Sequence, residues 1–283
     1  MSSMDKISII GNGAMAMDIA QVCAQNGKNV VVRGRSDEKL KAAAAKIEKG
    51  TARLVEKGRM TEDDKQALIG RIKYTTDLNN TADSDLIIEA VAEDVETKVD
   101  IFQKLDAICK EDAIFATNTS TISITQLASR INRTDKFIGM HFFNPATLMK
   151  LVEVIRGMAT SDDTYDKIMT LCADIGKQAV EVNDSPGFIV NRVLIPMINE
   201  AIFILMEGVA SAEDIDSAMK LGANHPMGPL ALSDLIGNDV VLHIMGLLYS
   251  ETGDPKYRPC TLLQKMVRGG LLGKKTGKGF YTY

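Results

Sequence analysis

The sequence predicts an α/β protein in which a doubly wound, mostly parallel sheet with helices on its faces is followed by an all-α domain. Three observations predict this fold class. Short β-branched runs alternate with helical patterns through the first half of the chain. A glycine-rich turn separates the first of these runs from the first helix. Beyond Pro186, helical patterns follow one another with no convincing strand before the last few residues. Alternating strands and helices form βαβ units, whose parallel sheet is buried on both faces.

The elements of the first half follow from periodicity and from capping residues. Strands are expected at residues 6–10, 29–32, 72–75, 86–90, 114–116, 137–142 and 151–155. The first helix is expected over 14–25. Ser36 is the expected N-cap of a long second helix that ends near Gly58, and Asp37 and Glu38 in its first turn favour that start.

The second half is expected to be helical throughout. Pro186 is expected at the first turn of a long apolar helix that runs to about residue 208. Further helices are expected at 212–221, 230–238, 240–250 and 261–267. A chain of 283 residues suggests two domains. We place them at residues 1–184 and 185–283.

Composition excludes several classes of protein. Lys plus Arg is 33 and Asp plus Glu is 37, and the resulting net charge of −4 does not suit a nucleic-acid-binding domain. Pro196 and Glu200 interrupt the longest apolar stretch, so no membrane-spanning helix is expected. The four cysteines form no CxxC motif and no Cys/His cluster, so we expect reduced thiols and no metal site. Since the chain also shows no signal-peptide pattern, a cytoplasmic protein is favoured.

The glycine-rich turn has the pattern of a dinucleotide-binding loop. Gly11 permits the tight turn, Gly13 lets a pyrophosphate approach the backbone, and Ala16 is small enough for helix–strand packing. The helix that opens at Ala14 and Met15 would present its N-terminus to the pyrophosphate. This placement between strand and helix predicts a Rossmann-type domain. The alternative is a glycine-rich turn that binds nothing.

The end of the second strand bears on the choice of nicotinamide cofactor. NAD enzymes usually carry an acidic residue about 20 residues after the glycines, where it binds the ribose 2′-hydroxyl. Here Arg33, Gly34, Arg35 and Ser36 stand instead. Two guanidiniums and a hydroxyl suit a 2′-phosphate. We therefore favour NADP(H) over NAD(H); the alternative is a solvated turn with two surface arginines and a helix cap.

His141 is the candidate acid/base group. It ends an expected strand, whereas His225 falls in a loop and His243 among helical residues. Glu153 lies inside an apolar strand, where a carboxylate is costly without a partner. If the two strands pair antiparallel about residue 147, Glu153 lies opposite His141 and can fix the imidazole tautomer. Such a pair, without a nearby nucleophile, suits proton transfer to a hydroxyl or carbonyl; the alternative is a buried structural ion pair.

Four motifs together resemble the L-3-hydroxyacyl-CoA dehydrogenases. They are Asn118-Thr119-Ser120, His141-Phe142-Phe143-Asn144-Pro145, Met149-Lys150-Leu151-Val152-Glu153-Val154-Ile155 and Pro186-Gly187-Phe188-Ile189-Val190-Asn191-Arg192. Residues 218–229 and 277–281 also match, so the resemblance covers essentially the whole chain. The nearest members are the short bacterial enzymes that act on 3-hydroxybutyryl-CoA. The resemblance implies interconversion of acetoacetyl-CoA and (S)-3-hydroxybutanoyl-CoA, and a homodimer formed through the C-terminal domain.

The resemblance also implies roles for individual residues. His141 would be the acid/base group with Glu153 as its orienting partner, and Asn191 would complete the site from the second domain. Ser120 would contact the substrate oxygen and the nicotinamide, although it could instead cap the following helix. The other matching cofactor positions, each of which would pass as an ordinary surface residue by sequence alone, are Glu93, Lys98, Asn144 and Lys275. The chain departs from the family at Ala16, Met17 and, above all, Gly34, so the resemblance does not by itself imply NAD.

Basic residues on the second helix form a candidate binding site for the phosphates of CoA. They recur at helical spacing, at Lys46, Lys49, Arg53 and Lys57. Most such stripes are merely solvated, but in the resembled family this helix contacts CoA, which favours Arg53 and Lys57 as substrate contacts.

Two other functions remain open from the sequence. One is an NAD(P)-dependent dehydrogenase that acts on a free 3-hydroxy acid. The other is a nucleotide-binding protein that keeps the fold without catalysis.

Overall fold

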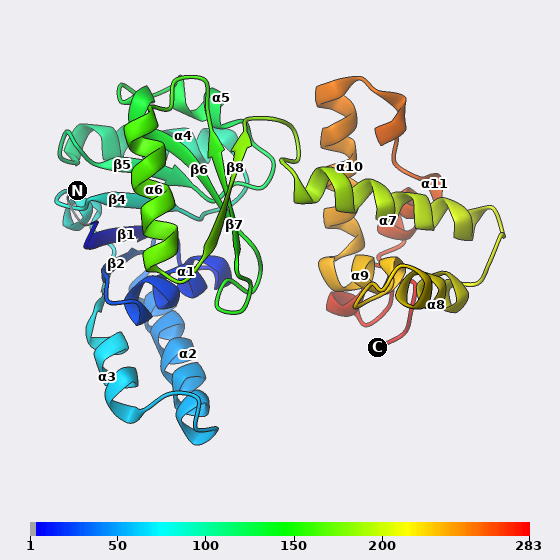
Figure 1. The fold of residues 1–283 in the computed structure, drawn as a ribbon, viewed down its shortest axis with the longest axis horizontal. Helices are drawn as coiled ribbons and strands as arrows, with labels where there is room; N and C mark the ends of the chain where they lie inside the picture. The colour runs from blue at the N-terminus through cyan, green and yellow to red at the C-terminus, as the bar shows by residue number, and fades with distance from the viewer. Residues whose placement is uncertain (1–3) are drawn as a thin grey trace. The chain divides into compact units, whose positions relative to one another are not determined.

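The structure is a computed structural model that describes residues 4–283. It divides into two compact units, one ending at Ser185 and the other running Pro186–Tyr283. The fold class is as predicted, an eight-stranded, mostly parallel sheet with helices, followed by a helical region (Figure 1).

The sheet of the first unit has the strand order β3-β2-β1-β4-β5-β6-β7-β8. Its strands are β1 (Lys6–Ile10), β2 (Asn29–Arg33), β3 (Ile72–Thr75), β4 (Leu86–Glu89), β5 (Ile114–Thr117), β6 (Phe137–Phe142), β7 (Leu151–Arg156) and β8 (Gln178–Asn183). Every neighbouring pair is parallel except β6 and β7. From β1 the strand order runs to β3 on one side, and from β4 it runs to β8 on the other. The order of strands therefore reverses between β1 and β4, and sheets of this kind bind ligands at that switch point.

Helices cover both faces of this sheet. They are α1 (Ala14–Gln25), α2 (Asp37–Glu56), α3 (Glu62–Gly70), α4 (Val95–Ile108), α5 (Ile124–Ala128) and α6 (Asp162–Asp174). Buried residues of α1, α2 and α6 form one core with alternate strand residues such as Ile9, Val32 and Met140. On the opposite face, Phe102 of α4 stacks on Phe115 and meets Phe137 edge-on. The α2–α3 pair projects away from the sheet (Figure 1).

Arg133 fastens the C-terminal end of α4. Its guanidinium donates to Asp106 (Nε–Oδ1, 2.6 Å) and to main-chain carbonyls, and it stacks on Phe115 at 4.5 Å. The carbonyl acceptors are those of Asp106, Cys109, Lys110 and Ala113. A helix end leaves carbonyls without intrahelical donors. Of these acceptors, Asp106 lies in the last turn of α4 and Cys109 is its C-cap, so this one side chain binds the helix end and the turn that follows it.

The second unit consists of helices around its own core. They are α7 (Val190–Met206), α8 (Ala212–Gly222), α9 (Pro229–Ile236), α10 (Asn238–Thr252) and α11 (Thr261–Arg268). The core is built from apolar residues such as Ile198, Leu230 and Met245. Within residues 4–283, no single helix is long and apolar enough to cross a membrane; α9 and α10 pass that test only jointly, across a bend of 97°.

Two details differ from the expected elements. The strand β8 was not anticipated, because most of its residues are exposed at the sheet edge and it lacks a buried run. The long helix begins at Val190 rather than near Pro186, because Gly187 and Phe188 both have positive φ (73° and 51°) and break the helical path. Ser36, in contrast, is the N-cap of α2 as predicted, accepting from the Lys39 N–H.

Candidate active site

The carboxyl ends of the parallel strands meet along one edge of the sheet. Ile10 of β1 pairs in register with both Arg33 and Glu89, and Glu89 pairs with Thr117. The loops that follow these residues therefore lie side by side. Many of the first unit's candidate residues stand on these loops, at the starts of the helices that follow them or on the β6–β7 hairpin.

The glycine-rich loop has the shape that a pyrophosphate needs. Gly11 has φ +135°, and a Cβ there would lie 2.4 Å from the carbonyl oxygen of Ala90, so only glycine fits. A Cβ on Gly13 would meet nothing within 4 Å, which leaves its backbone open to a ligand. Gly13 is also the N-cap of α1 and offers no side-chain cap. The main-chain N–H groups at the start of α1 can therefore serve an anion.

The end of β2 presents a guanidinium whose hydrogen bonding is incomplete. Within the described residues, Arg33 Nε is buried and has no hydrogen-bond partner. A buried donor without an acceptor is costly, which makes it a candidate to receive a ligand oxygen. Arg35 is exposed beside it, and the Ser36 hydroxyl accepts from Lys39 N at 3.5 Å. The residues at this corner thus offer guanidinium and hydroxyl groups to an anion.

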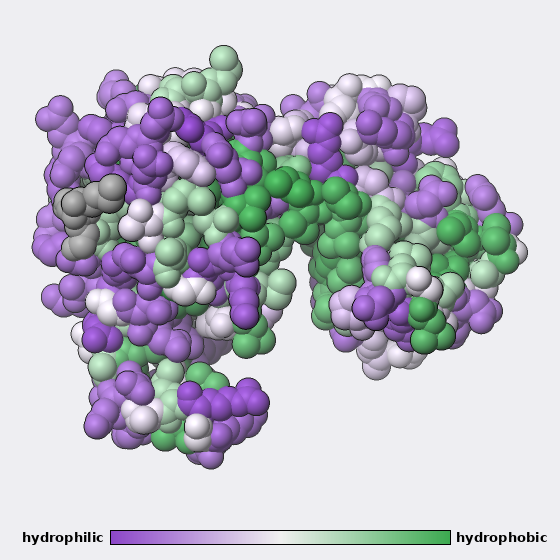
Figure 2. Space-filling view, viewed as in Figure 1, coloured by the Kyte–Doolittle hydropathy of each residue, from purple (hydrophilic) through white to green (hydrophobic). Residues whose placement is uncertain are grey.

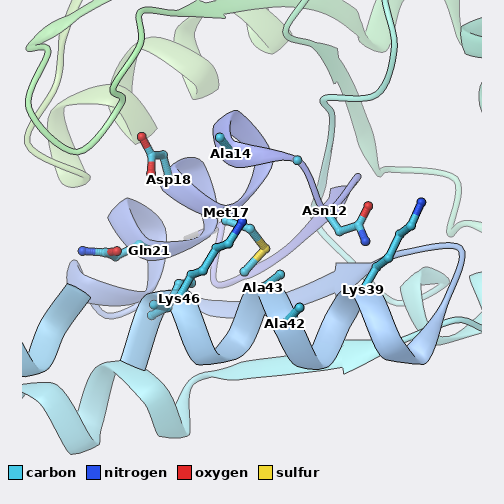
Figure 3. Close-up of a pocket in the computed structure, with 11 residues that line it drawn as sticks. Asn12, Ala14, Met17, Asp18, Gln21, Lys39, Ala42, Ala43 and Lys46 are labelled. Atoms are coloured by element: carbon cyan, nitrogen blue, oxygen red, sulfur yellow. The ribbon is translucent and has the colours of Figure 1, made fainter. Parts of the chain in front are cut away.

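A pocket of about 350 Å³ opens between the glycine-rich loop and α2. Figure 3 shows Asn12 and Lys39 close together at one end of it, with Lys46, Asp18 and Gln21 toward the other. The rest of its lining is apolar and consists of Gly13, Ala14, Met17, Ala42, Ala43 and Ile47. The pocket thus carries the ammonium groups of Lys39 and Lys46, which suit phosphate, together with the carboxylate of Asp18.

The loop after β5 is held by the carboxylate of Glu93. Its Oε1 accepts from Ser120 N (2.8 Å), Thr121 N (3.1 Å) and Thr121 Oγ1 (2.9 Å), and also from the Thr119 hydroxyl. Burial alone would raise the pKa of Glu93, but the charge of Lys98 and these hydrogen bonds outweigh it, so the pKa lies below its ordinary value. The carboxylate therefore fixes the backbone that carries Ser120.

Lys98 lies between two carboxylates. Its Nζ is 2.7 Å from Glu89 Oε1 and 3.2 Å from Glu93 Oε2, and its side chain is only 1 % exposed. Glu89, fully buried, also accepts from the Thr117 hydroxyl and from Val91 N. Lys98, which by sequence alone would pass as an ordinary surface residue, is therefore a buried member of an ion-pair cluster.

Ser120 does not cap the next helix. The N-cap of α5 is Ser123, whose hydroxyl accepts from Gln126 N, so the capping alternative for Ser120 is wrong. Asn118, two residues earlier, accepts from Phe142 N at 2.9 Å. This bond ties the Ser120 loop to the end of β6, the strand that carries His141.

His141 and Glu153 face each other across the antiparallel pair β6–β7, which confirms the predicted register. The Nδ1 of His141 lies 2.7 Å from Glu153 Oε2. Glu153 is 1 % exposed and His141 is 6 % exposed, and the imidazole leans on the ring of Phe143 at 4.5 Å. A carboxylate at Nδ1 fixes the tautomer and orientation of the imidazole, an arrangement that suits proton transfer at Nε2.

Two charged side chains anchor the hairpin loop that carries Asn144. Lys177 Nζ donates to the carbonyls of Ala146 (2.5 Å) and Met149 (2.8 Å). Asp18 accepts from Ala146 N at 3.0 Å, and its pKa is raised because burial outweighs that hydrogen bond. Asn144 itself is exposed, directly beyond the end of β6. The loop is therefore fastened to α1 and to the start of β8.

The remaining candidates of the first unit lie on α2. Lys46, Lys49, Arg53 and Lys57 are all exposed, and Lys57 is the C-cap residue just past the helix. The buried stripe of α2 consists of Leu40, Ala43, Ile47 and Thr51. The basic side chains therefore stand clear of the core.

The second unit carries Asn191 and Lys275. Asn191 is the second residue of α7 and is half-buried. Lys275 is exposed and forms an ion pair with Asp239 at the start of α10 (2.5 Å). The tail after Lys275 is held by buried Asp234, which accepts from Phe280 N and Tyr281 N.

Sequence reasoning missed several residues of this region. Glu89 had a usable signal, because an acid that ends an apolar strand needs a partner, as Glu153 did. Lys39 and Asp18 line the pocket but carried no pattern of their own. Among the described residues, no group of three or more His, Cys, Asp or Glu side chains could hold a metal ion.

Both parts of the chain match models of one enzyme family. Residues 6–185 match the NAD binding domain of 3-hydroxyacyl-CoA dehydrogenase, and residues 187–283 match its C-terminal domain. The chain belongs to the 3-hydroxyacyl-CoA dehydrogenase family, as the sequence motifs indicated.

Within that family, similar proteins share a more specific name. The chain is 52% identical over 278 residues to the 3-hydroxybutyryl-CoA dehydrogenase of Clostridioides difficile, covering 98% of this chain and 99% of that protein. It is 50% identical to the probable 3-hydroxybutyryl-CoA dehydrogenase of Bacillus subtilis, covering 98% and 97%. The crystal structure of (S)-3-hydroxybutyryl-CoA dehydrogenase PaaH1 from Ralstonia eutropha has a TM-score of 0.97 and 49% identity, with 99% of each chain covered.

Proposed function

We propose that this protein is a 3-hydroxybutyryl-CoA dehydrogenase that interconverts acetoacetyl-CoA and (S)-3-hydroxybutanoyl-CoA and prefers NADP(H). The names of relatives at about half identity support the reaction. The observation that carries the proposal is the buried His141–Glu153 pair, with Nδ1 and Oε2 2.7 Å apart, on adjacent strands at the ligand edge of the sheet.

Side chains of this protein accept and donate the proton that moves in the reaction. In oxidation, His141 takes the proton of the 3-hydroxyl at Nε2; in reduction, the protonated imidazole returns it to the developing alkoxide. Glu153 holds the ring in one orientation and stabilises the cation that forms. Ser120 binds the same substrate oxygen, on a backbone that Glu93 fixes. Asn191 contributes from the second unit. The bound nicotinamide supplies or accepts the hydride at C3.

The dinucleotide would be held mainly by residues at the carboxyl edge of the sheet. The pyrophosphate site is formed by Gly11, Gly13, Ala14, Met15 and Ala16. The 2′-phosphate is bound by Arg33, Arg35 and Ser36. The nicotinamide end is contacted by Glu93, Lys98, Ser120, Asn144 and Lys275. The buried Arg33 Nε without a partner supports NADP(H) over NAD(H).

The CoA carrier is proposed to lie along α2. Arg53 and Lys57 bind its phosphates, and Lys46 continues the same basic stripe into the pocket beside the glycine-rich loop (Figure 3). Exposed ammonium and guanidinium groups are suitable partners for the several phosphate charges of CoA.

A homodimer formed through the second unit is also proposed. Large apolar side chains are exposed there, including Val193 (68 %), Val209 (70 %) and Leu221 (88 %). Figure 2 shows hydrophobic surface on the helices of this unit. A monomer in light scattering would contradict this proposal.

The four cysteines are free, which supports a reducing cytoplasm as the location.

The test is reduction of acetoacetyl-CoA by the purified protein with NADPH and with NADH. We expect kcat/KM to be about tenfold or more higher with NADPH, equivalent to about 1.4 kcal/mol. A preference for NADH would overturn the cofactor proposal and leave the reaction standing. Turnover of acetoacetate but not of its thioester would select a dehydrogenase of free 3-hydroxy acids. Cofactor binding without any turnover would favour a non-catalytic protein.

A further inference from the structure

The space beside Gly34 is already filled. A Cβ built on Gly34 would lie 2.7 Å from Leu40 Cδ2 and 2.8 Å from Leu40 Cγ, with Asn12 Nδ2 at 3.3 Å. Nonbonded carbon atoms in contact normally stand about 3.5–4.0 Å apart. Any side chain at position 34, and not only an acidic one, would therefore require Leu40 or the backbone to shift.

The backbone at this position cannot move aside easily. The N–H of Gly34 donates to Thr75 O at 3.0 Å, on the neighbouring strand β3. The carbonyl of Arg33 accepts from Gly11 N at 2.9 Å, on the side of β1. Residues 33 and 34 are therefore held between two strands, and a new Cβ must displace its neighbour instead.

That neighbour, Leu40, belongs to the core. It is 3 % exposed and packs in one cluster with Val32, Ala43 and Ile47. Its main-chain N–H donates to Ser36 O at 3.0 Å in the first turn of α2. Displacing Leu40 would disturb the contact between α2 and the sheet.

We propose that Leu40 is a specificity-determining residue, which keeps position 34 without a side chain and so keeps out the carboxylate that binds a ribose 2′-hydroxyl. Leu40 acts by occupying space and need not touch the cofactor. The Gly34–Leu40 pair thus disfavours NAD(H) by excluding the carboxylate, and Arg33 attracts the 2′-phosphate of NADP(H). This inference rests on the proposed preference for NADP(H).

A consequence is that an acid introduced at position 34 does not work alone. In Gly34→Asp, the new Cβ meets Leu40 before the carboxylate can adopt a binding position. Shortening Leu40 to alanine removes both atoms of the close contact, Cγ and Cδ2. The pair Gly34→Asp/Leu40→Ala is therefore the smallest change that gives an acid at this place both charge and room.

The experiment compares the wild type with Gly34→Asp, Leu40→Ala and the double variant. Melting temperature, dissociation constants for NADPH and NADH from cofactor fluorescence, and kcat/KM with each cofactor are measured. Gly34→Asp should have a lower melting temperature than the wild type. Adding Leu40→Ala to Gly34→Asp should lower the melting temperature by less than Leu40→Ala lowers it in the wild type. The ratio of NADH to NADPH affinity should rise about tenfold or more further in the double variant than in Gly34→Asp.

Matched variants separate space from charge. Gly34→Ala should lower the melting temperature much as Gly34→Asp does, because both carry a Cβ, but should leave the cofactor ratio near that of the wild type. If the alanine at position 40 prevents folding, Gly34→Ala/Leu40→Val tests the same coupling by melting temperature with a smaller deletion.

The outcomes distinguish this inference from the proposal on which it rests. If Gly34→Asp alone melts like the wild type and shifts the cofactor ratio as far as the double variant, Leu40 excludes nothing and the inference is wrong. Additive losses of melting temperature at positions 34 and 40 would overturn it as well. A wild type that binds NADH more tightly than NADPH refutes the preference for NADP(H), whatever the coupling between the two positions.

Discussion

Replacing Glu153 by glutamine tests the central pair of the site. Glutamine keeps the length and shape of the side chain, so its amide oxygen can still accept from His141 Nδ1 at the position where Oε2 now lies, 2.7 Å away. What changes is the charge that faces the imidazolium when His141 holds the transferred proton. Because Glu153 is 1 % exposed, little solvent is present to compensate.

The size of the effect follows from the kind of hydrogen bond that is lost. A bond to a charged group contributes about 1.5–3 kcal/mol, and a neutral bond about 0.5–1.5 kcal/mol. The exchange therefore costs about 1–1.5 kcal/mol, which lowers kcat by about 5- to 10-fold. His141→Gln removes the proton-transfer group itself and should lower kcat by about 10²-fold or more.

The assay is oxidation of (S)-3-hydroxybutanoyl-CoA, followed by cofactor absorbance, in the two single variants and in the double variant. Since Glu153 acts through His141, the double variant should be no slower than His141→Gln alone. Equal NADPH affinity in all the proteins is the control for an intact cofactor site. A double variant slowed by the product of the single effects would refute the reasoning, because Glu153 would then act independently of His141.

Three further predictions concern stability and substrate binding. Arg133→Met, which strips the end of α4 of its donors, should lower the free energy of unfolding by about 3–5 kcal/mol in urea titrations; Lys104→Met, which breaks an exposed pair, should cost less than about 1 kcal/mol. The folded pKa of Glu93 lies below its ordinary value of 4.5. Its stabilisation is therefore complete above that value and is lost as pH falls through the folded pKa, so the melting temperatures of wild type and Glu93→Gln should converge only in acid. Lys57→Ala should raise KM for acetoacetyl-CoA severalfold, less so at high salt, with KM for NADPH unchanged; an equal effect of Lys41→Ala, off the basic stripe, would contradict a specific contact.

The part of the site that the sequence predicted best depends on strand geometry. Residues 141 and 153 are equally far from the centre of a short loop, and antiparallel pairing then places them opposite each other. Only the residue types and the apolar setting of Glu153 were needed for that argument. The glycine-rich loop was predictable for a similar reason, since its strand and helix are adjacent in the chain.

The parts that sequence reasoning missed depend on contacts between distant segments. Glu89 and Lys98 form a buried ion pair only because α4 folds back over β4, and Lys98 alone resembled a surface residue. Leu40 lies on the buried stripe of α2, and its contact with Gly34 depends on how that helix packs on the end of β2. No periodicity in the chain reports such a distance.

The location of the acid/base pair within the sheet has a consequence for how the protein loses function on heating. Both β6 and β7 are interior strands, so the backbone positions that carry His141 and Glu153 can separate only if the ladder between Ile138–Phe142 and Val152–Arg156 opens. Opening interior strands costs nearly the full free energy of global unfolding, and their amides are the slowest to exchange with solvent. Fraying of the surrounding loops would therefore leave the pair assembled, and the imidazole would keep its carboxylate for as long as the first unit holds its sheet.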